Sequence, residues 1–224
     1  MSLLKEYGLT DKQVELFEQY SDLLLKWNEM FNLTAIKDKD EIVEKHFIDS
    51  LFLDKYVDLD GKSFLDVGSG AGFPGIPLAI AHPTCKISLL ESNGKKIKFL
   101  QEVKKELGLE NVSIIQARAE EFDKRESFDF VSARAVKELR ILLEICFHLV
   151  KVGGSFVAYK SKGVDEEINA SKNAFKVLKI NKISRYEYNL PKSKDNRVLL
   201  VILKENKTLK KYPRHYSEIV KAPL

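Results

Sequence analysis

A glycine-rich segment that directly follows a short apolar stretch constrains the fold more than any other part of the sequence. Residues 63–67 have the composition of a buried strand, and Asp66-Val-Gly-Ser-Gly-Ala-Gly-Phe-Pro-Gly75 runs on from them. Pro74 suits the start of a helix because its φ is fixed near the helical value. A strand that delivers such a turn to a helix lets backbone amides approach a ligand closely. The segment therefore predicts a binding loop between a strand and a helix.

The rest of the chain after residue 61 alternates between strand and helix patterns. Further strands are predicted at 86–91, 112–117, 128–133 and 155–160, and helices at 74–81, 95–107, 138–150 and 164–178. Two more β-rich stretches, 183–190 and 197–204, flank a Pro-Lys-Ser-Lys-Asp turn and predict a closing hairpin. This order predicts an α/β fold: a mainly parallel seven-stranded sheet with helices on both faces and an antiparallel pair at one edge.

Two helices are expected before this core. Thr10 and Gln13 have the spacing of a capping box, and apolar residues then recur at helical spacing as far as Phe31. Asp38 and Glu41 mark the start of a second helix. The predicted organisation is a helical extension over residues 1–60, a core over 61–205 and a basic, loosely held tail over 206–224.

The charges are distributed unevenly along the chain. The 37 Lys and Arg residues and 33 Asp and Glu residues give a net charge of +4, but residues 1–62 carry −6, residues 63–150 carry 0 and residues 151–224 carry +10. The basic last third indicates an anionic partner, with solvated lysines on helix faces as the alternative. No export signal, membrane-spanning run, cysteine pairing or histidine ligand spacing is visible. We therefore expect a cytoplasmic protein with reduced cysteines, no metal and no membrane partner.

The spacing of the glycines narrows the class of ligand. Counted from the strand end, the loop reads Asp-x-Gly-x-Gly-x-Gly, which resembles the first motif of the Rossmann-like class I S-adenosylmethionine-dependent methyltransferases. A dinucleotide fingerprint fits only when counted from Gly70, which leaves two extra residues after the strand, so it ranks second. Glu91 ends the second strand, 23 residues after Gly68, near the spacing at which an acid accepts ribose hydroxyls.

The residues after the fourth strand constrain the methyl acceptor. The segment contains no Asp/Asn-Pro-Pro-aromatic loop for an exocyclic amine and no cysteine for attack on a pyrimidine carbon. What it offers is Arg134, a cation. Guanine N7 has a free lone pair and no proton to remove, so positioning alone can suffice and no general base is required. This argument permits an N7 target without proving one.

Several blocks together resemble one family, the bacterial ribosomal RNA small subunit methyltransferase G, also called glucose-inhibited division protein B. The blocks are Trp27-Asn28, Asn32-Leu-Thr-Ala-Ile36, His46-Phe-Ile-Asp-Ser-Leu51, the segment 66–78, Ala117-Arg-Ala-Glu120 and Ala133-Arg-Ala135, with Lys160 and Arg197. The resemblance implies methyl transfer from S-adenosylmethionine to N7 of a guanine in 16S ribosomal RNA, as naked RNA or within the small subunit. A monomer is the default expectation.

The resemblance also implies roles for individual residues. The implied cofactor-binding set is Asp66, Gly68, Ser69, Gly70, Phe73, Glu91, Ala119, Glu120 and Arg134. Gly68 and Phe73 would line the methionine and ribose side, Ala119 and Glu120 would contact adenine, and Arg134 would close the pocket. One departure is Lys160-Ser-Lys162-Gly163, where the family often has Lys-Gly at the strand end. Which of these two lysines faces the site stays open.

The remaining site residues each have two interpretations. His46 and Asp49 share one face of the second helix; with Arg134 they are positioning candidates on a lid, or they form a hydrogen-bonded pair without a chemical role. Asn32 is a cap or an RNA contact, and Trp27 is expected in the core. The candidate RNA contacts are Asn32, His46, Lys160, Lys162, Lys192, Lys194 and Arg197. If the basic residues contact phosphates, binding weakens with salt and with loss of their charge.

Three functions compete on these grounds. The first is an RNA methyltransferase. The second is an RNA chaperone or assembly factor that binds S-adenosylmethionine only structurally, and the third is a methyltransferase for a small molecule or protein on the same fold. A nicotinamide-dependent dehydrogenase is disfavoured by the glycine register and by Asp66.

Overall fold

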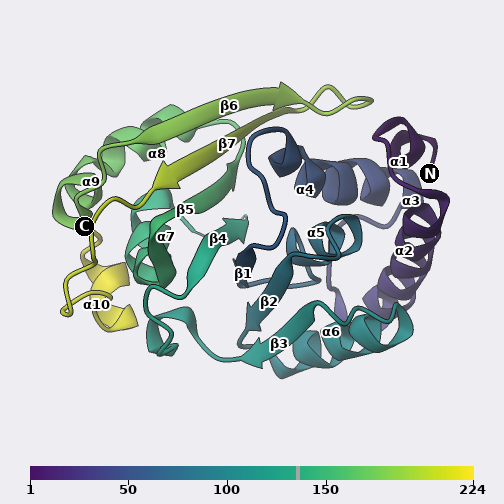
Figure 1. Ribbon diagram of the computed structural model, residues 1–224, viewed down its shortest axis with the longest axis horizontal. Coiled ribbons are helices and arrows are strands. Elements are labelled where there is room, and N and C mark those ends of the chain that lie inside the picture. Colours follow the sequence, from purple (N-terminus) through teal and green to yellow (C-terminus); the bar gives the residue numbers. More distant parts are fainter. Residues whose placement is uncertain (135–136) are drawn as a thin grey trace. The chain divides into compact units, whose positions relative to one another are not determined.

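The seven strands have the order β3-β2-β1-β4-β5-β7-β6 in the computed structural model, which describes residues 1–134 and 137–224. They are β1 (Ser63–Val67), β2 (Lys86–Glu91), β3 (Val112–Gln116), β4 (Phe128–Arg134), β5 (Val150–Lys160), β6 (Ile183–Asn189) and β7 (Asn196–Leu203). The pairs β1–β2, β2–β3 and β4–β5 are parallel, whereas β7 runs antiparallel to both β5 and β6. The predicted mainly parallel sheet with a closing hairpin is confirmed (Figure 1).

The contacts between residues divide the chain into two units, which are described separately. Unit 1 comprises Met1–Gln116 together with Leu190–Lys194, the tip of the β6–β7 hairpin, and unit 2 comprises Ala117–Asn189 and Asp195–Leu224. No helix within residues 1–134 and 137–224 has the length and apolar character that crossing a membrane requires.

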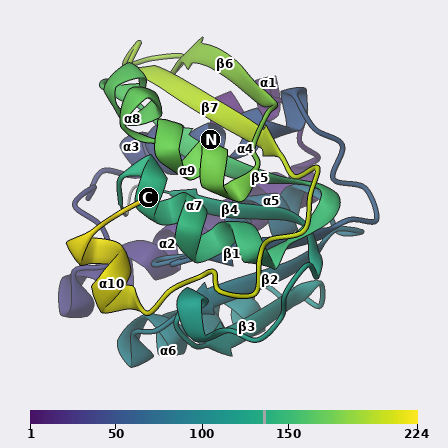
Figure 2. The same ribbon diagram turned by 90° about the vertical axis from the view of Figure 1, so that its left-hand side faces the viewer.

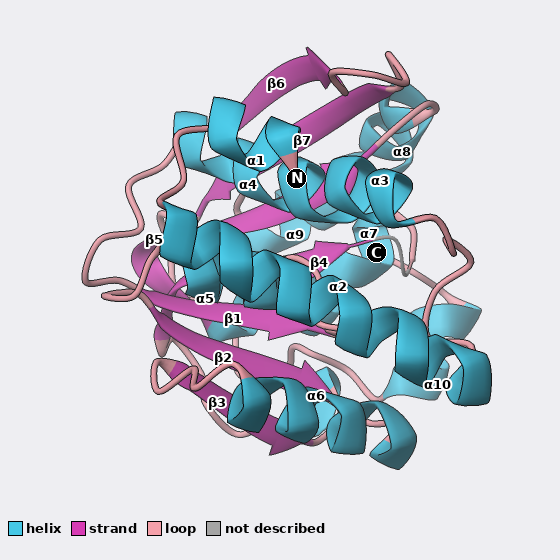
Figure 3. Ribbon diagram, turned by 90° about the vertical axis from the view of Figure 1, so that its right-hand side faces the viewer, coloured by secondary structure: helices cyan, strands magenta, loops and turns pink. Residues whose placement is uncertain are grey.

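Unit 1 is built from β1, β2 and β3 with helices packed on them. Its helices are α1 (Ser2–Glu6), α2 (Asp11–Phe31), α3 (Lys39–Ile42), α4 (Asp49–Leu51), α5 (Gly75–Ala81) and α6 (Gly94–Glu106). α5 packs on β1 and β2, α6 packs on β2 and β3, and α2 contacts both α5 and α6 (Figure 3). The predicted capping box of α2 is confirmed: Thr10 Oγ1 accepts the Gln13 N–H, and the Gln13 side chain accepts the Thr10 N–H.

The second N-terminal helix is broken, where the sequence predicts one continuous element. Between α3 and α4 lies a π-helical stretch, η1 (Val43–Ile48), and a 3₁₀ turn, η2 (Phe52–Lys55), follows α4. A π-helical stretch adds a residue to the turn and often lies at a functional site. This one contains Glu44 and His46, and its buried side chains include Phe47 and Ile48.

Unit 2 contains β4 to β7 and the remaining helices. These are η3 (Ala119–Glu121), α7 (Leu139–Cys146), η4 (Phe147–Leu149), α8 (Val164–Ala170), α9 (Lys172–Leu178) and α10 (Tyr216–Lys221). The helix predicted over 164–178 is interrupted at Ser171, whose hydroxyl donates to the Glu167 carbonyl oxygen at 2.7 Å. The helix predicted over 138–150 ends early, and β5 begins at Val150 instead of Ser155.

The expectation of a loosely held tail is wrong. The Arg125 guanidinium donates to the carbonyl oxygens of Tyr212, Thr208 and Leu209 at 2.8, 3.1 and 3.3 Å. Tyr212 is buried, and Ile219 of α10 is fully buried. α10 packs against α7 (Figure 2). The segment 206–224 is therefore an integral part of unit 2, fixed by contacts with residues about 80 positions away that no local pattern reveals.

Candidate functional site

The carboxylate of Asp66 anchors the glycine-rich loop. This carboxylate is fully buried, and its Oδ2 accepts the N–H of Gly75 at 2.9 Å. Gly75 begins α5, so the negative charge lies at the positive end of the helix. Asp66 therefore fixes the spacing between β1 and α5, and its predicted contact with a cofactor stays a prediction.

Gly72 leaves no room for a side chain in the loop. Its φ is +98°, and a Cβ there would lie 2.6 Å from Ile76 Cγ1 and 2.9 Å from the Tyr20 hydroxyl oxygen. The Tyr20 hydroxyl donates to the Ala71 carbonyl oxygen. Because Tyr20 belongs to α2, the N-terminal extension holds this loop in shape. The sequence analysis places Tyr20 among the apolar positions of its helix and misses this role.

The loop is also tied to β2. The N–H groups of Gly68 and Ser69 both point to the Leu90 carbonyl oxygen, at 2.8 and 3.2 Å. Ser69 is buried, and its hydroxyl lies 3.4 Å from the same oxygen. Gly68 and Ser69, which are both predicted cofactor residues, therefore fix the shape of the loop by bonding to β2.

Glu91 and the loop are brought together, as their spacing predicts. Glu91 Oε2 accepts the N–H of Gly70 at 2.9 Å, and Oε1 accepts the N–H groups of Ser92 and Asn93 at 2.8 and 2.9 Å. A carboxylate has about four acceptor positions, so these three bonds leave capacity for a ligand hydroxyl. A Cβ on Gly70 would meet nothing closer than the Gly68 carbonyl oxygen at 3.8 Å. The loop is therefore open at Gly70 and closed at Gly72, which is the shape a cradle for a nucleoside needs.

His46 contacts the same loop from the π-helical stretch. Its ring stacks on Phe73, with centroids 4.3 Å apart and planes at 18°. Its Nε2 lies 2.8 Å from Thr34 Oγ1, and the Thr34 N–H bonds to Asn28 Oδ1 at 2.9 Å. Asp49 is buried in α4. Thr34 is missed as a site residue by the sequence analysis, although it lies within the matched block 32–36.

Asn32 and Trp27 lie near the end of α2. Asn32 is the C-cap with φ +47°, so its interpretation as a cap is confirmed, and its side chain is exposed. Trp27 packs against Phe31 and Phe99 with centroids 5.4 and 5.6 Å apart, but it is half-buried and not part of the buried core in which the sequence analysis places it.

Unit 2 carries the other predicted cofactor residues. Ala119 is buried in η3, and Glu120 is nearly buried with its carboxylate 3.8 Å from Arg118. Arg134 ends β4 and is half-buried. Ala135, the last residue of one block in the family resemblance, lies outside the described residues together with Val136.

The two lysines after β5 differ in environment. The Lys160 side chain is only 9% exposed, and its Nζ bonds to Glu167 Oε2 at 2.6 Å and to the Lys137 carbonyl oxygen at 3.0 Å. Glu167 also accepts the Leu139 N–H at 2.7 Å. Lys162 is exposed. Lys160 is therefore held by an internal ion pair, whereas Lys162 faces solvent.

Among the predicted RNA contacts around the β6–β7 hairpin, Lys192 and Lys194 are exposed and Arg197 is half-buried, and all three bond within the chain. Lys192 Nζ lies 3.4 Å from Asp40 Oδ2, and Lys194 Nζ donates to the Pro191 carbonyl oxygen at 2.7 Å. The hairpin tip is fixed to unit 1, because buried Glu44 accepts the N–H of Lys192 and also that of the next residue. In unit 2, the Arg197 guanidinium lies 3.3 Å from an Asp195 carboxylate oxygen.

One lysine of the basic third is part of the core. Lys204 is fully buried, and its Nζ donates to the carbonyl oxygens of Phe147 and Val150 at 3.0 and 2.8 Å and lies 3.5 Å from Glu126 Oε1. Burial lowers the pKa of Lys204 to about 8. The net charge of +10 therefore overstates the positive charge available to a partner.

Two buried titratable groups of unit 2, Cys146 and His148, are held in their neutral forms. Burial raises the pKa of the Cys146 thiol and lowers that of His148 to about 4, so each favours its neutral form at neutral pH. Cys85 and Cys146 are both free and buried. Among residues 1–134 and 137–224, no group of His, Cys, Asp and Glu side chains has the arrangement of a metal site.

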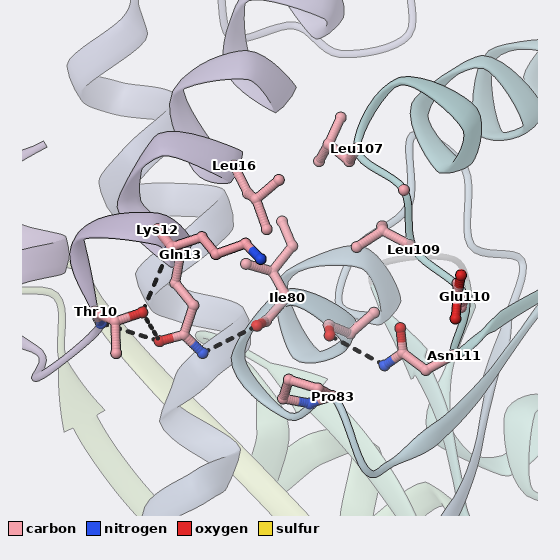
Figure 4. A pocket seen from close by; sticks show the side chains of 12 residues that line it. Thr10, Lys12, Gln13, Leu16, Ile80, Pro83, Leu107, Leu109, Glu110 and Asn111 are labelled. Carbon is pink, nitrogen blue, oxygen red and sulfur yellow. Dashed lines mark hydrogen bonds between the residues drawn. The ribbon is translucent and has the colours of Figure 1, made fainter.

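A separate hollow of about 560 Å³ lies in unit 1, away from the loop residues (Figure 4). Gln13 and Asn111 line it, but their amide groups already donate to the Ile80 and Ala79 carbonyl oxygens at 3.0 and 3.1 Å. None of the predicted site residues lines this hollow. Its polar groups tie α2 and the segment before β3 to the end of α5.

The sheet and the glycine-rich loop closed on Glu91 define a Rossmann-like class I methyltransferase fold. The fold is shared with a SAM-dependent methyltransferase from Aquifex aeolicus (TM-score 0.56, 17% identity, 73% of this chain and 93% of that one). It is also shared with TYW2 of M. jannaschii, solved in complex with AdoMet (TM-score 0.54, 17% identity, 70% and 74% covered).

Sequence comparison gives the family. The model of rRNA small subunit methyltransferase G matches residues 13–197. Ribosomal RNA small subunit methyltransferase G from Ligilactobacillus salivarius (strain UCC118) is 44% identical over 225 residues, which covers 97% of this chain and 93% of the relative. The chain belongs to the rRNA small subunit methyltransferase G family, and the resemblance stated from the sequence is confirmed.

Proposed function

We propose that this protein transfers a methyl group from S-adenosylmethionine to N7 of a guanine in 16S ribosomal RNA. The observation that carries the proposal is the family match over residues 13–197, on a chain whose loop is open at Gly70 beside the carboxylate of Glu91. When bound, S-adenosylmethionine supplies a methyl group on a positively charged sulfur, which a good nucleophile can take without further activation.

The cofactor is assigned to the loop and Glu91. Glu91 keeps acceptor capacity for a hydroxyl of the ribose, and Gly70 leaves room for the sugar. Asp66 and Tyr20 hold the loop in place before any ligand binds, so little ordering entropy is lost on binding. The roles of Ala119, Glu120 and Arg134 follow from the family resemblance and remain part of the proposal.

The N-terminal segment 1–60 is proposed as a lid over the acceptor base. The stacking of His46 on Phe73 supports this, because it joins the segment directly to the cofactor loop. N7 of guanine carries a lone pair and no proton, so the residues have only to bind, orient and exclude water. Arg134, Asp49 and His46 are assigned to positioning, and no residue is assigned as a general base.

The RNA phosphates are assigned first to the exposed cations Lys162, Lys192 and Lys194. Lys160 and Arg197 are assigned a secondary role, because their side chains are only 9% and 21% exposed, whereas that of Lys192 is 51% exposed although it is paired with Asp40. We further propose that the enzyme acts as a monomer in the cytoplasm, on RNA that is naked or within the small subunit.

The test is incorporation of labelled methyl groups into 16S RNA, offered naked and within 30S subunits, followed by mass spectrometry of the digested nucleosides. We expect one 7-methylguanosine per RNA with the wild-type chain, and a large loss with Glu91→Gln. Glu15→Gln, the same chemical change at an exposed position of α2, is the matched control. Binding of S-adenosylmethionine without methylation of either RNA form would favour the chaperone function. Methylation of a protein or small molecule instead would favour the third function.

A further inference from the structure

The C-terminal segment brings an aromatic side chain to the two loops that follow β3 and β4. Tyr216 is the first residue of α10 and is half-buried. Arg118 belongs to the loop after β3, and Lys137 lies three residues after the end of β4. All three residues belong to unit 2.

Two cations converge on the Tyr216 ring. The Arg118 guanidinium carbon and the Lys137 ammonium nitrogen each lie 5.9 Å from its centroid. Arg118 is 56% exposed, its contact with Glu120 is long at 3.8 Å, and Lys137 is exposed. An exposed cation beside the ring attracts an anion, so a ligand that joins a flat ring to a negative charge fits this cluster.

The ring is held in place by the fixed C-terminal segment. Arg214, two residues before Tyr216, donates from Nε and one terminal nitrogen to the two carboxylate oxygens of fully buried Glu144, both at 2.6 Å. His215 caps α10, with its N–H bonded to Glu218 Oε2 at 3.3 Å. The tyrosine is thus presented by a rigid support, and little conformational entropy is lost when something stacks on it.

The chemistry of this cluster matches single-stranded RNA. Proteins bind unpaired nucleotides by stacking bases on aromatic rings or guanidinium planes and by placing cations on the phosphates. Lys137 and Arg118 flank in sequence the residues assigned to the cofactor, since Arg118 precedes Glu120 by two positions and Lys137 follows Arg134 by three. A nucleotide bound to this cluster would therefore contact the same two chain segments that carry Glu120 and Arg134.

We propose that Tyr216, Arg118 and Lys137 form a binding site for an unpaired nucleotide of the RNA substrate, with the base stacked on the ring or guanidinium and its phosphate on the lysine. The proposal rests on the proposed function, because it assumes that RNA is the substrate. It assigns the segment 206–224, which lies beyond the matched residues 13–197, to substrate binding.

The experiment measures the affinity of the full-length protein for a single-stranded fragment of 16S RNA at several salt concentrations. Tyr216→Ala is expected to weaken binding about tenfold, since base–aromatic stacking contributes roughly 1–3 kcal/mol per base. Tyr216→Phe is expected to bind within about twofold of wild type. Lys137→Ala is expected to weaken binding and to reduce the salt slope by about one. Lys221→Ala, the same change at an exposed position of α10, is the control and should have a smaller effect.

The outcomes separate the two proposals. If the wild-type chain neither binds nor methylates RNA, the proposed function fails. If it methylates RNA but Tyr216→Ala binds RNA as tightly as wild type, or Lys137→Ala matches Lys221→Ala in affinity and salt slope, the nucleotide site is refuted. Should Tyr216→Ala unfold, as a thermal melt would reveal, the comparison of the two lysine variants decides. If the variants lose as much affinity for polyglutamate as for RNA, the nucleotide site is also refuted, because that result indicates general anion binding.

Discussion

Alanine substitutions at Gly72 and Gly70 test two different roles within the glycine-rich loop. Gly72 is expected to matter for packing, and Gly70 for binding of the cofactor. Both residues have a positive φ, +98° at Gly72 and +60° at Gly70. At Gly72 a Cβ would also collide with Ile76 and with the Tyr20 hydroxyl, whereas at Gly70 the nearest atom is 3.8 Å away. The two variants therefore share the backbone strain and differ in the steric clash.

The magnitudes follow from these contacts. A left-handed conformation costs an alanine about 1–2 kcal/mol, and forcing extra volume into a packed site costs about 1–3 kcal/mol more. Gly72→Ala should thus lower the free energy of unfolding by roughly 2–5 kcal/mol, and Gly70→Ala by about 1–2 kcal/mol. For a chain of this size 1 kcal/mol shifts Tm by about 2–4 °C. The expected fall is roughly 4–20 °C for Gly72→Ala and about 2–8 °C for Gly70→Ala.

The assay pairs thermal and urea unfolding with calorimetric binding of S-adenosylmethionine. Gly70→Ala should bind the cofactor about tenfold or more weakly despite its nearly normal stability, because its methyl group occupies the open side of the cradle. Equal destabilisation by both variants would refute the packing argument at Gly72. Unchanged cofactor affinity in Gly70→Ala would refute the cradle.

Three further predictions concern charged and titratable groups. Glu91→Gln should weaken S-adenosylmethionine binding at least tenfold and also lower Tm, since the amide NH2 group would face a backbone N–H that the buried carboxylate accepts; calorimetry with equal affinities would contradict this. Burial lowers the pKa of His148 to about 4 in the folded state, so the unfolded state binds more protons between pH 4 and 6.5. The free energy of unfolding should therefore fall by up to about 3 kcal/mol as pH drops through that window, and His148→Gln should flatten the urea-melt profile. Arg214→Ala leaves the fully buried Glu144 unpaired and should cost about 3–5 kcal/mol, with faster proteolysis of the C-terminal segment as the readout.

Local sequence patterns predict the seven strands and the glycine-rich loop. The alternation of short apolar stretches with amphipathic ones predicts the seven strands, because a strand that is buried on both faces of a sheet consists of a short apolar run. The capping box at Thr10 is confirmed since its two bonds join residues three positions apart. Glu91 lies beside the glycine-rich loop because the parallel neighbours β1 and β2 end at the same edge of the sheet.

Breaks within helices were beyond the sequence patterns. The π-helical stretch over Val43–Ile48 and the interruption at Ser171 follow no glycine or proline signal. The π-helical stretch contains a side chain with a distant partner: Glu44 accepts two amides of the hairpin tip, nearly 150 residues later in the chain. Periodicity carries no information about such pairs.

The sequence by itself determined the class of fold, the cofactor loop and the family, because these depend on hydrophobic periodicity and on residues close together in the chain. Tertiary structure decided which charged side chains remain available to a binding partner. It placed Lys204 in the core, paired Lys160 with Glu167, and fixed a basic tail that brings Tyr216 to Arg118 and Lys137. A charge counts toward a partner only if burial and internal ion pairs leave it exposed, and both are set by contacts between residues distant in sequence.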